Sequence, residues 1–424
     1  MRRARELRCV PVQLTAAAAL LVALAVAALT LAEVAGSPPR RPGSPAIAGG
    51  VRAFTQVLDE AQVRATAPAQ WATLARENTV VVLNSWDYHL IPVLKRANPG
   101  VQVWVYKNLS GVRSDDCTTP SGQCGSCPSS VTDHSLLSSG LGYCWVRRNH
   151  PDWLLRAAGS RGPLEFSGYP DTWETDYGNL AYQRQWTANV VADVHRHGWD
   201  GVDVDNALTT ADAYGTAARY RTDATVQAAT YSALRTIGHA MHQARVAWVV
   251  NVGYATRFPG LWQRWLRLAG GLEQEYYLSF TTQPDGIGPA WAAYQQEVSS
   301  CAGQHKVCWF HAGGYTTAVT SQTRAYALAS FLLATDGRQL LSVGGPPPLP
   351  LAPGWALGRP LGPMHSAGAA WLRPFAHGLA VVNPTASSTP VDLGGKYLTR
   401  AGHPVPAVML RPASGAVLRP ATKM

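Results

Sequence analysis

The sequence predicts an α/β protein: a (β/α)8 barrel, or TIM barrel, followed by a small β-sandwich-like C-terminal domain. Eight short apolar runs recur along the chain, and helix-length intervals separate most of them. Hydrophobic residues make up 46% of the 424 residues and charged residues only 15%, so the chain can bury a large core. A change in composition after Gly345 predicts where the barrel ends.

The eight apolar runs read as strands of a parallel sheet. They occupy residues 51–58, 79–85, 101–107, 201–206, 248–253, 272–277, 307–313 and 340–345. Near-continuous apolar runs are typical of strands that are buried on both faces. Ala-rich segments with apolar residues at three-to-four spacing predict helices from Leu180 to His197 and from Tyr214 to Ala244. Such helices would cover the outside of the barrel.

The N-terminus has the composition of an export signal. Four arginines precede an apolar stretch from Leu14 to Ala32, which a Gly/Pro/Ser-rich segment follows. We expect a signal peptide or signal anchor over residues 1–35 and a linker over 36–50. Cleavage is the favoured interpretation, but the stretch is long enough to cross a bilayer as an uncleaved anchor. The sequence therefore predicts a secreted or extracytoplasmic protein that contacts membrane only through such an anchor.

The remaining chain divides into a barrel, a linker and a second domain. We expect the barrel over residues 51–345, with an insertion at 108–199 between the third and fourth strands. This insertion opens at the face where barrel active sites are built, as one wall of a substrate cleft or as a surface decoration. A proline-rich linker at 346–363 leads to short β-prone pieces at 364–424, which predict the C-terminal domain.

Cysteines after the signal are even in number, as expected in an oxidising compartment. They are Cys117, Cys124, Cys127, Cys144, Cys301 and Cys308. We expect three disulfides, of which Cys301 and Cys308 form one across a short turn. The other four allow three pairings that the sequence does not separate. Zinc at Cys124 and Cys127 is the alternative, although a single C-x-x-C without a second pair is a weak signal.

Charge and motifs exclude several classes of function. The net charge is +10, but no run of Lys or Arg with interleaved aromatics appears, so we expect no nucleic-acid partner. The sequence has no Gly-rich phosphate loop, no H-E-x-x-H and no G-x-S-x-G. Nucleotide hydrolysis, zincin proteolysis and esterase chemistry therefore lack their usual residues. No cofactor is implied.

The string GWDGVDVDN, residues 198–206, carries the first candidate for catalysis. Asp203 and Asp205 are two residues apart on one predicted strand, so both should point into the barrel. Asp205 is nearer the C-terminal end of the strand, where catalytic groups sit, and we take it as the nucleophile. We expect Asp203 to support it from deeper in the barrel. The alternative is that these aspartates only bind backbone amides or pair with Lys.

A second pair of carboxyl groups lies two strands further on, in LEQEYY. Glu273 and Glu275 also share a face, and Glu275 stands at the end of the strand beside Tyr276 and Tyr277. Two carboxylates on facing strands are the minimum requirement for glycoside hydrolysis, one as nucleophile and one as proton donor. We assign the proton to Glu275, because neighbouring aromatics would desolvate it and raise its pKa from about 4.3 toward roughly 6. A salt-bridge role is the alternative.

Other polar and aromatic side chains fall at the predicted strand ends and would surround the mouth of the barrel. The candidates for substrate binding are Trp86, Asp87, Lys107, Asp176, Asp203, Asn251, Tyr276 and His311. Sugar sites combine hydrogen-bonding groups with flat aromatic faces, and this set provides both. For His311 the ordinary alternative is a core residue, and for Trp86 it is packing. Asp176 precedes a predicted helix, where we expect it to act as an N-terminal cap.

Several strings together resemble a known family. NHPDWLLRAAG, TDYGNLAYQRQW, GWDGVDVDNAL, LEQEYY, LGRPLGP and LAVVNPT resemble the hypothetical glycosyl-hydrolase-like barrel proteins distantly related to the α-galactosidase superfamily. The resemblance runs from Val51 to about Pro420. It implies a nucleophilic aspartate after the fourth strand and a proton-donating acid after the sixth, where Asp205 and Glu275 fall. It also keeps Asp176 as a site candidate. Asp203 departs from the pattern, which more often has an apolar or aromatic residue there.

The sequence thus predicts a glycoside hydrolase that cleaves O-glycosidic bonds of an extracellular or cell-envelope polysaccharide. One alternative is a carbohydrate-binding or envelope-assembly barrel without catalysis, and another is a metal-dependent deacetylase. Carboxyl groups about 5 to 5.5 Å apart would predict retention of anomeric configuration, and about 6.5 to 9.5 Å would predict inversion.

Overall fold

The computed structural model describes most of the chain after residue 50. The described ranges are 51–116, 124, 136–280, 283–314, 319–344, 357–398 and 402–421. The predicted signal or anchor, the linker at 36–50 and most of the proline-rich linker lie outside them. Cys117 and Cys127 lie outside them as well.

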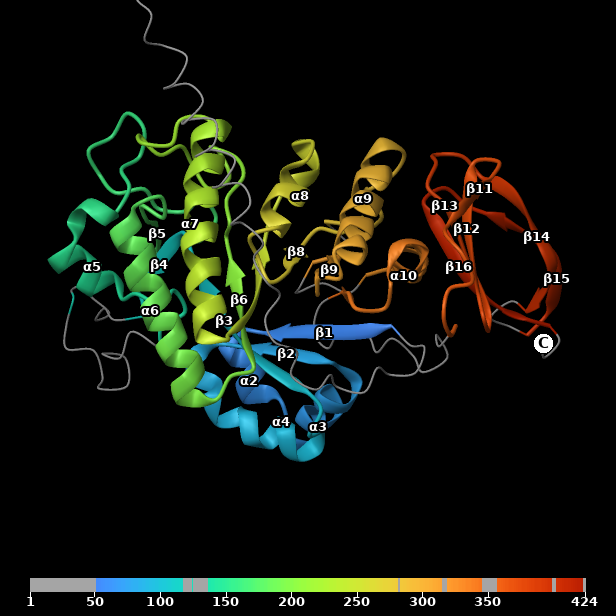
Figure 1. The fold of residues 1–424 in the computed structure, drawn as a ribbon, viewed down its shortest axis with the longest axis horizontal. Helices are drawn as coiled ribbons and strands as arrows, with labels where there is room; N and C mark the ends of the chain where they lie inside the picture. The colour runs from blue at the N-terminus through green and yellow to red at the C-terminus, as the bar shows by residue number, and fades with distance from the viewer. Residues whose placement is uncertain are drawn as a thin grey trace, which may run out of the picture. The chain divides into compact units, whose positions relative to one another are not determined.

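Eight parallel strands close into a barrel, which confirms the predicted fold class (Figure 1). They are β1 (Arg52–Val57), β2 (Val80–Leu83), β3 (Gln102–Asn108), β6 (Gly201–Asp205), β7 (Ala247–Asn251), β8 (Leu272–Gln274), β9 (Trp309–Ala312) and β10 (Leu340–Val343). The order around the barrel follows the sequence, and β1 pairs with β10 to close it. Each strand lies within one of the eight apolar runs, or extends one by a single residue.

Helices connect the strands along the outside of the barrel. They are α2 (Glu60–Ala65), α3 (Pro68–Glu77), α4 (Ile91–Ala97), α5 (Tyr143–Asn149), α6 (Leu180–His197), α7 (Asp223–Ala244), α8 (Leu261–Leu266), α9 (Pro289–Gly303) and α10 (Ser321–Ala334). Short 3-10 turns are η1 (Ser85–Leu90), η3 (Pro151–Trp153) and η4 (Ala255–Arg257). Helix α6 has the predicted bounds.

The second predicted helix was placed too early. Helix α7 begins at Asp223 rather than Tyr214, because the Thr222 side chain accepts a hydrogen bond from the backbone N–H of Thr225 and caps the helix there. The segment before this cap is irregular, which leaves Tyr214 available to the mouth of the barrel.

Side chains inside the barrel form an apolar floor with polar layers above it. The floor consists of Phe54, Val80, Val82, Trp104, Val249, Trp309 and Leu340. Gly201 on β6 makes room for Trp104, since a Cβ at this glycine would lie 2.7 Å from the indole and 2.8 Å from the Ala247 carbonyl oxygen. Because side chains alternate along a strand, Asp203 and Asp205 then face the same interior.

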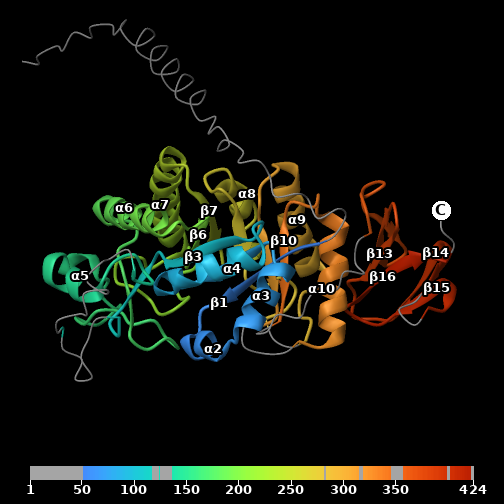
Figure 2. The same ribbon diagram turned by 90° about the horizontal axis from the view of Figure 1, so that it is seen from below.

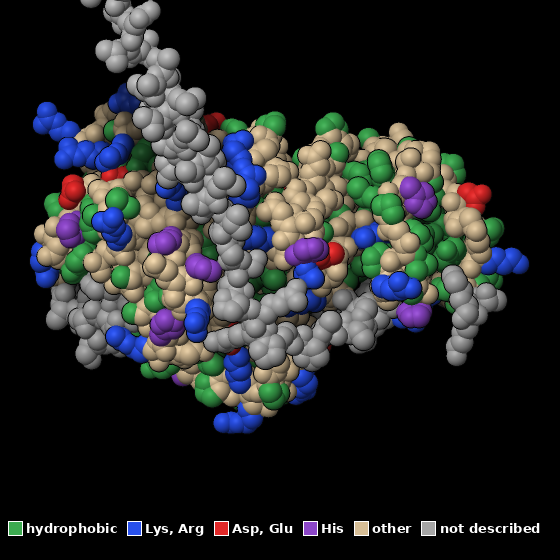
Figure 3. All heavy atoms as spheres, viewed as in Figure 1, with side chains coloured by type: hydrophobic (Ala, Val, Ile, Leu, Met, Phe, Trp, Pro, Cys, Tyr) green, Lys and Arg blue, Asp and Glu red, His purple; other side chains and the backbone are tan. Residues whose placement is uncertain are grey.

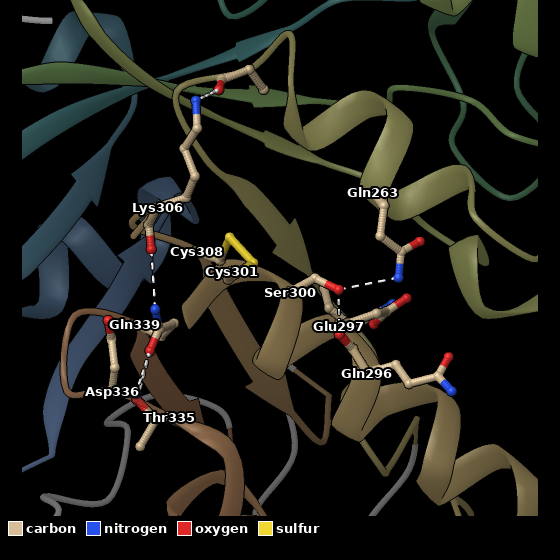
Figure 4. The surroundings of a disulfide bond; sticks show 12 residues. Gln263, Gln296, Glu297, Ser300, Cys301, Lys306, Cys308, Thr335, Asp336 and Gln339 are labelled. Carbon is tan, nitrogen blue, oxygen red and sulfur yellow. Dashed lines mark hydrogen bonds between the residues drawn. A yellow bond between two sulfur atoms is a disulfide. The ribbon is translucent and has the colours of Figure 1, made fainter. Parts of the chain in front are cut away.

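Two disulfides lie among the described residues. Cys301 on α9 is bonded to Cys308, the residue before β9, which confirms that predicted pair (Figure 4). Nearby, Gln339 donates to the Lys306 carbonyl oxygen and accepts from Thr335, as the dashed lines in Figure 4 show. The second bond joins Cys124 to Cys144 on α5. Both of its cysteines belong to the insertion between β3 and β6.

The insertion also contains a small antiparallel sheet. It is formed by β4 (Gly111–Arg113) and β5 (Thr172–Glu174), which pair with each other. Among the described residues, helix α5 and the turn η3 lie between these two strands in sequence.

After the barrel, six antiparallel strands form a β-sandwich-like unit with its own apolar core. They are β11 (His365–Ala367), β12 (Ala370–Phe375), β13 (Gly378–Asn383), β14 (Thr389–Leu398), β15 (Pro404–Leu410) and β16 (Ser414–Pro420). Helix α10 lies against β13 and β16 (Figures 1 and 2). Gln322 on α10 donates to the carbonyl oxygens of Pro412 and Ala413, and Arg373 on β12 donates to that of Leu332.

The hydropathy of the helices and the distribution of basic side chains bear on the predicted membrane and nucleic-acid contacts. None of the helices in the described ranges is both long and apolar enough to span a bilayer. Lys and Arg side chains are spread over separate places on the face drawn in Figure 3.

We predict that Gly201→Ala destabilises the barrel by about 2–3 kcal/mol, because the added methyl group would overlap the Trp104 indole and the Ala247 backbone. Thermal unfolding followed by circular dichroism measures this loss. The matched control is Gly303→Ala at the end of α9, where an added Cβ meets no atom within 4 Å. Equal melting temperatures for the two variants would contradict the prediction.

Candidate active site

A cleft of about 1290 Å³ opens at the C-terminal ends of the barrel strands. Six predicted site residues line it: Trp86, Asp203, Asp205, Asn251, Glu275 and Tyr276. The insertion contributes Arg113, Leu137, Phe166 and Tyr169, so it forms one wall of the cleft. This observation decides between the two roles that the sequence left open for the insertion.

Asp205 ends β6 and is held by three neighbouring residues. The Tyr106 hydroxyl donates to its Oδ2 at 2.6 Å, and the Asn251 side chain donates to its Oδ1 at 2.9 Å. Asn206 donates through both its backbone N–H (2.7 Å) and its side-chain amide (3.0 Å). Burial raises the pKa of Asp205, while these hydrogen bonds act in the opposite direction. They also fix the orientation of the carboxylate.

Glu275 follows β8 directly, and the same asparagine holds it. The Nδ2 atom of Asn251 donates to Glu275 Oε2 at 2.8 Å, in addition to its bond with Asp205 Oδ1. Burial, followed by the negative charge of Asp205, raises the pKa of Glu275 to about 7. A carboxyl group with this pKa can hold a proton near neutral pH, as the acid of a glycosidase must.

The shared amide keeps the two carboxyl groups close together. Asp205 Oδ1 and Glu275 Oε2 both accept from one nitrogen atom, at 2.9 and 2.8 Å, so these two oxygens lie less than about 6 Å apart. This limit is compatible with the spacing of about 5 to 5.5 Å in retaining glycosidases and is below the spacing of about 6.5 to 9.5 Å in inverting ones.

Aromatic side chains surround the catalytic candidates. Phe166 stacks on Tyr214 with ring centroids 4.2 Å apart, and Tyr169 meets the edge of Tyr214 at 5.4 Å. Tyr276, which also lines the cleft, packs edge-on against Phe280 at 4.6 Å. Tyr169 and Phe280 are more than half exposed, at 54% each. Exposed flat rings at the rim of a cleft suit the apolar faces of sugars.

Lys107 does not reach the cleft, contrary to the sequence interpretation. Strand β3 continues to Asn108, so Lys107 alternates with Tyr106 and points out of the barrel. Its amino group is fully buried and forms an ion pair with Asp193 on α6 at 2.6 Å. It also donates to Ser85 Oγ and to the Leu137 carbonyl oxygen. These contacts join β3 to α6, η1 and the insertion.

Three other predicted residues are also placed away from the cleft. Asp176 accepts hydrogen bonds from Arg219 and Tyr220, and Asn179 rather than Asp176 caps α6. Asp87 is buried in η1, where burial raises its pKa to about 6. His311 is buried inside the barrel against Phe54, with its pKa lowered to about 3 by burial.

Sequence reasoning missed several residues that line the cleft. Tyr106 holds Asp205, Gln56 lies inside the barrel below it, and the Tyr214 hydroxyl donates to Asn206 Oδ1 at 2.7 Å. The alternation on β3 was a usable signal for Tyr106, because Trp104 and Tyr106 share the inward face. No local pattern marks Tyr214. Within the described ranges no group of three or more His, Cys, Asp or Glu could hold a metal ion.

Comparison with known families identifies the class of protein. The model of the family described as hypothetical glycosyl hydrolase family 15 matches residues 95–379, which include β3 and every later barrel strand. The chain belongs to this family. Membership confirms the resemblance predicted from the sequence and supports glycoside hydrolase as the enzyme class. No curated protein sequence matches the chain significantly.

Solved structures of similar fold include an α-amylase, a glycoside hydrolase domain and an α-galactosidase. An α-amylase from Malbranchea cinnamomea is 12% identical over 87% of this chain and 96% of its own, with a TM-score of 0.50. The glycoside hydrolase domain of PelA from Pseudomonas aeruginosa is 12% identical over 71% and 99%, at 0.43. The GH36 α-galactosidase AgaA from Geobacillus stearothermophilus is 12% identical over 87% and 55%, at 0.45. Because its sequence is only 12% identical, the likeness of the α-amylase to this protein is one of fold alone.

We predict that Lys107→Met lowers the free energy of unfolding by about 3–5 kcal/mol, because it leaves the Asp193 carboxylate buried without its cation. Urea denaturation measures the loss. Arg64→Met is the control: it removes an exposed ion pair with Glu60 and should cost less than about 1 kcal/mol. If both variants lose the same stability, the buried pair does not have the structural role assigned to it.

Proposed function

We propose that this protein is a secreted, retaining glycoside hydrolase that acts on an extracellular or cell-envelope polysaccharide. Asp205 is the nucleophile and Glu275 the acid/base. The observation that carries this proposal is the single Asn251 amide, which bonds both carboxyl groups and so keeps them close enough for a retaining pair. Membership in a glycosyl hydrolase family supports the same reaction class.

In the first step, protonated Glu275 gives its proton to the glycosidic oxygen while the bond from that oxygen to the anomeric carbon breaks. The Asp205 carboxylate attacks the same carbon from the other side and forms a glycosyl ester. In the second step, ionised Glu275 takes a proton from water. The resulting hydroxide oxygen bonds to the anomeric carbon, the ester bond breaks, and Asp205 is restored as a carboxylate.

The surrounding residues prepare the two carboxyl groups for these roles. Tyr106, Asn206 and Asn251 donate to Asp205, so its ionised form is stabilised and its direction of attack is fixed. Glu275 has fewer donors, Asn251 and Tyr276, and its burial together with the negative charge of Asp205 favours its protonated form. The two carboxyl groups are thereby separated into base and acid by their environments.

Three features support a polymeric, extracellular substrate. They are the lining of the cleft, the disulfides and the N-terminal segment. The cleft is lined by residues from β1, from the loop after β9 and from the insertion, and exposed aromatic rings stand at its rim. Two disulfides among the described residues fit an oxidising compartment. The N-terminal arginines and the apolar stretch after them fit export.

We predict that Asp205→Asn and Glu275→Gln each lower the release of reducing ends at least about 1000-fold, because each removes a group that reacts directly. The purified exported part is incubated with a panel of envelope and plant polysaccharides, and products are identified by mass. Tyr88→Phe, at the rim of the cleft, is the control that should retain most activity. Wild-type binding without any product would instead favour a carbohydrate-binding barrel.

The spacing of the carboxyl groups also predicts the stereochemistry of the product. Proton NMR of the first product formed should show the anomeric configuration of the substrate, because two successive displacements at one carbon restore it. A first product of opposite configuration would exclude Asp205 as a nucleophile and would require water to attack directly.

A further inference from the structure

The lining of the cleft carries an excess of negative charge. Among the described residues that line it, seven are Asp or Glu, and only Arg113 is a Lys or Arg. The whole chain has the opposite balance, with 36 Lys and Arg against 26 Asp and Glu. Residues 117–123 and 125–135 of the insertion, which lie outside the described ranges, contain no Lys or Arg. A concave surface lined by charges of one sign attracts ligands of the other sign.

Four of these carboxyl groups lie at one end of the cleft, called here the acidic end. They are Asp59 and Glu60 after β1, and Asp115 and Asp116 after β4. In the closed barrel β1 is four strands from β7 in either direction, so it lies opposite the strand that bears Asn251. Eight strands about 4.8 Å apart enclose a barrel at least about 12 Å across. The cleft thus crosses the mouth of the barrel from the catalytic pair to the acidic end, which suits a chain of sugars.

Three of the four carboxyl groups at the acidic end have a structural partner. Asp59 caps the N-terminus of α2. Glu60 pairs with Arg64 at 2.8 Å, and Asp115 pairs with Arg113. The placement of these three residues therefore also serves the fold.

Asp116 forms no ion pair with another described residue. The hydrogen bond that it accepts, from Ser138 Oγ, is long at 3.4 Å. Burial, followed by the negative charge of Asp115, raises the pKa of Asp116 to about 7. A cation bound beside it would offset both effects and stabilise the carboxylate. The indole N–H of Trp86 on η1, which also lines the cleft, is buried without an acceptor among the described residues and suits a sugar hydroxyl.

At the catalytic end, donor side chains are already engaged while one buried acceptor is not. Tyr106 and Asn206 donate to Asp205, and both N–H bonds of Asn251 Nδ2 are directed at the catalytic pair. Asn251 Oδ1 has no hydrogen-bond partner in the described part of the chain, although this side chain lines the cleft and is only 8% exposed. A buried acceptor without a donor is costly, so we expect a bound ligand to donate here.

The two ends together favour a sugar with a free amino group. A protonated amine has three N–H donors, no acceptor and a positive charge. It therefore suits both the carboxyl groups of the acidic end and the amide oxygen of Asn251. An N-acetyl group lacks the charge and adds a carbonyl oxygen that needs a donor. A uronic acid or a sulfate group would be repelled by the carboxyl groups.

We propose that the cleft binds a polymer of amino sugars with free, protonated amino groups, and that Asp116 is a specificity-determining residue for it. The inference rests on the proposed function, because it assigns a class of polysaccharide to the same cleft. Asp116 binds the ammonium group of a sugar remote from the bond that is cleaved. It therefore increases affinity without taking part in the reaction.

Paired oligosaccharides test the substrate class. Oligomers of glucosamine and of galactosamine are each prepared in the free-amine form and as fully N-acetylated copies, with oligomers of glucose and of galacturonic acid as neutral and acidic members. At about pH 7 and low salt, the full-length protein should cleave a free-amine oligomer with a kcat/KM at least about tenfold above that for every other form. Added salt should raise the KM for it, because salt screens the attraction. A higher kcat/KM for an N-acetylated, neutral or acidic oligomer would overturn the proposal.

Asp116→Asn tests the residue to which specificity is assigned. It should raise the KM for the free-amine oligomer about three- to tenfold and leave kcat within about twofold, because Asp116 lies away from the reacting atoms. The matched control is Asp152→Asn on η3, which removes an exposed carboxylate outside the cleft lining and should leave both constants unchanged. An equal KM in the two variants would overturn the role of Asp116.

A binding measurement distinguishes failure of this inference from failure of the proposed function. If the wild type cleaves none of the oligomers, the proposed function fails. Tryptophan fluorescence of the wild type then reports binding of the same oligomers. Tighter binding of a free-amine form, weakened by salt, supports the inference without catalysis. Equal binding of the free-amine and N-acetylated forms, or binding of neither, overturns it.

Discussion

The amide of Asn251 is the interaction on which the site depends. Strands β6 and β8 are separated by β7, and neighbouring strands lie about 4.8 Å apart, so their backbones are nearly 10 Å from each other. Two carboxyl groups on such strands would repel each other across this gap. One donor group on the strand between them draws both inward and satisfies both. The geometry of the proposed catalytic pair thus follows from the order of three adjacent strands.

Much of this arrangement could be predicted from the sequence because it depends on residues that are close together along the chain. The eight strands are buried on both faces and therefore appear as continuous apolar runs, and two-residue alternation places Asp205 above Asp203 and Glu275 above Glu273. Other contacts depend on distant parts of the chain. Tyr106 and Asp205 are 99 residues apart, and Gln56 and Glu273 are 217 apart. No local pattern records such pairs.

Two site residues were misplaced for different reasons. Lys107 was placed at the end of a strand that continues to Asn108, and one residue reverses the face to which a side chain points. Asp176 was taken as the cap of the helix that begins at Leu180, but Asn179, directly before that helix, has this role. The charges of Lys107 and Asp176 are instead compensated locally, by Asp193 and Arg219.

The two disulfides lie in different parts of the protein, one beside a barrel strand and one within the insertion. The bond between Cys301 and Cys308 lies at the N-terminal end of β9, on the opposite side of the barrel from the cleft. The bond between Cys124 and Cys144 begins and ends within the insertion. This disulfide therefore ties the insertion to itself and not to the barrel, to which hydrogen bonds such as that of Lys107 with the Leu137 carbonyl oxygen attach it. A change of sequence in the insertion would thus alter the wall of the cleft and leave the strands that bear Asp205 and Glu275 unchanged.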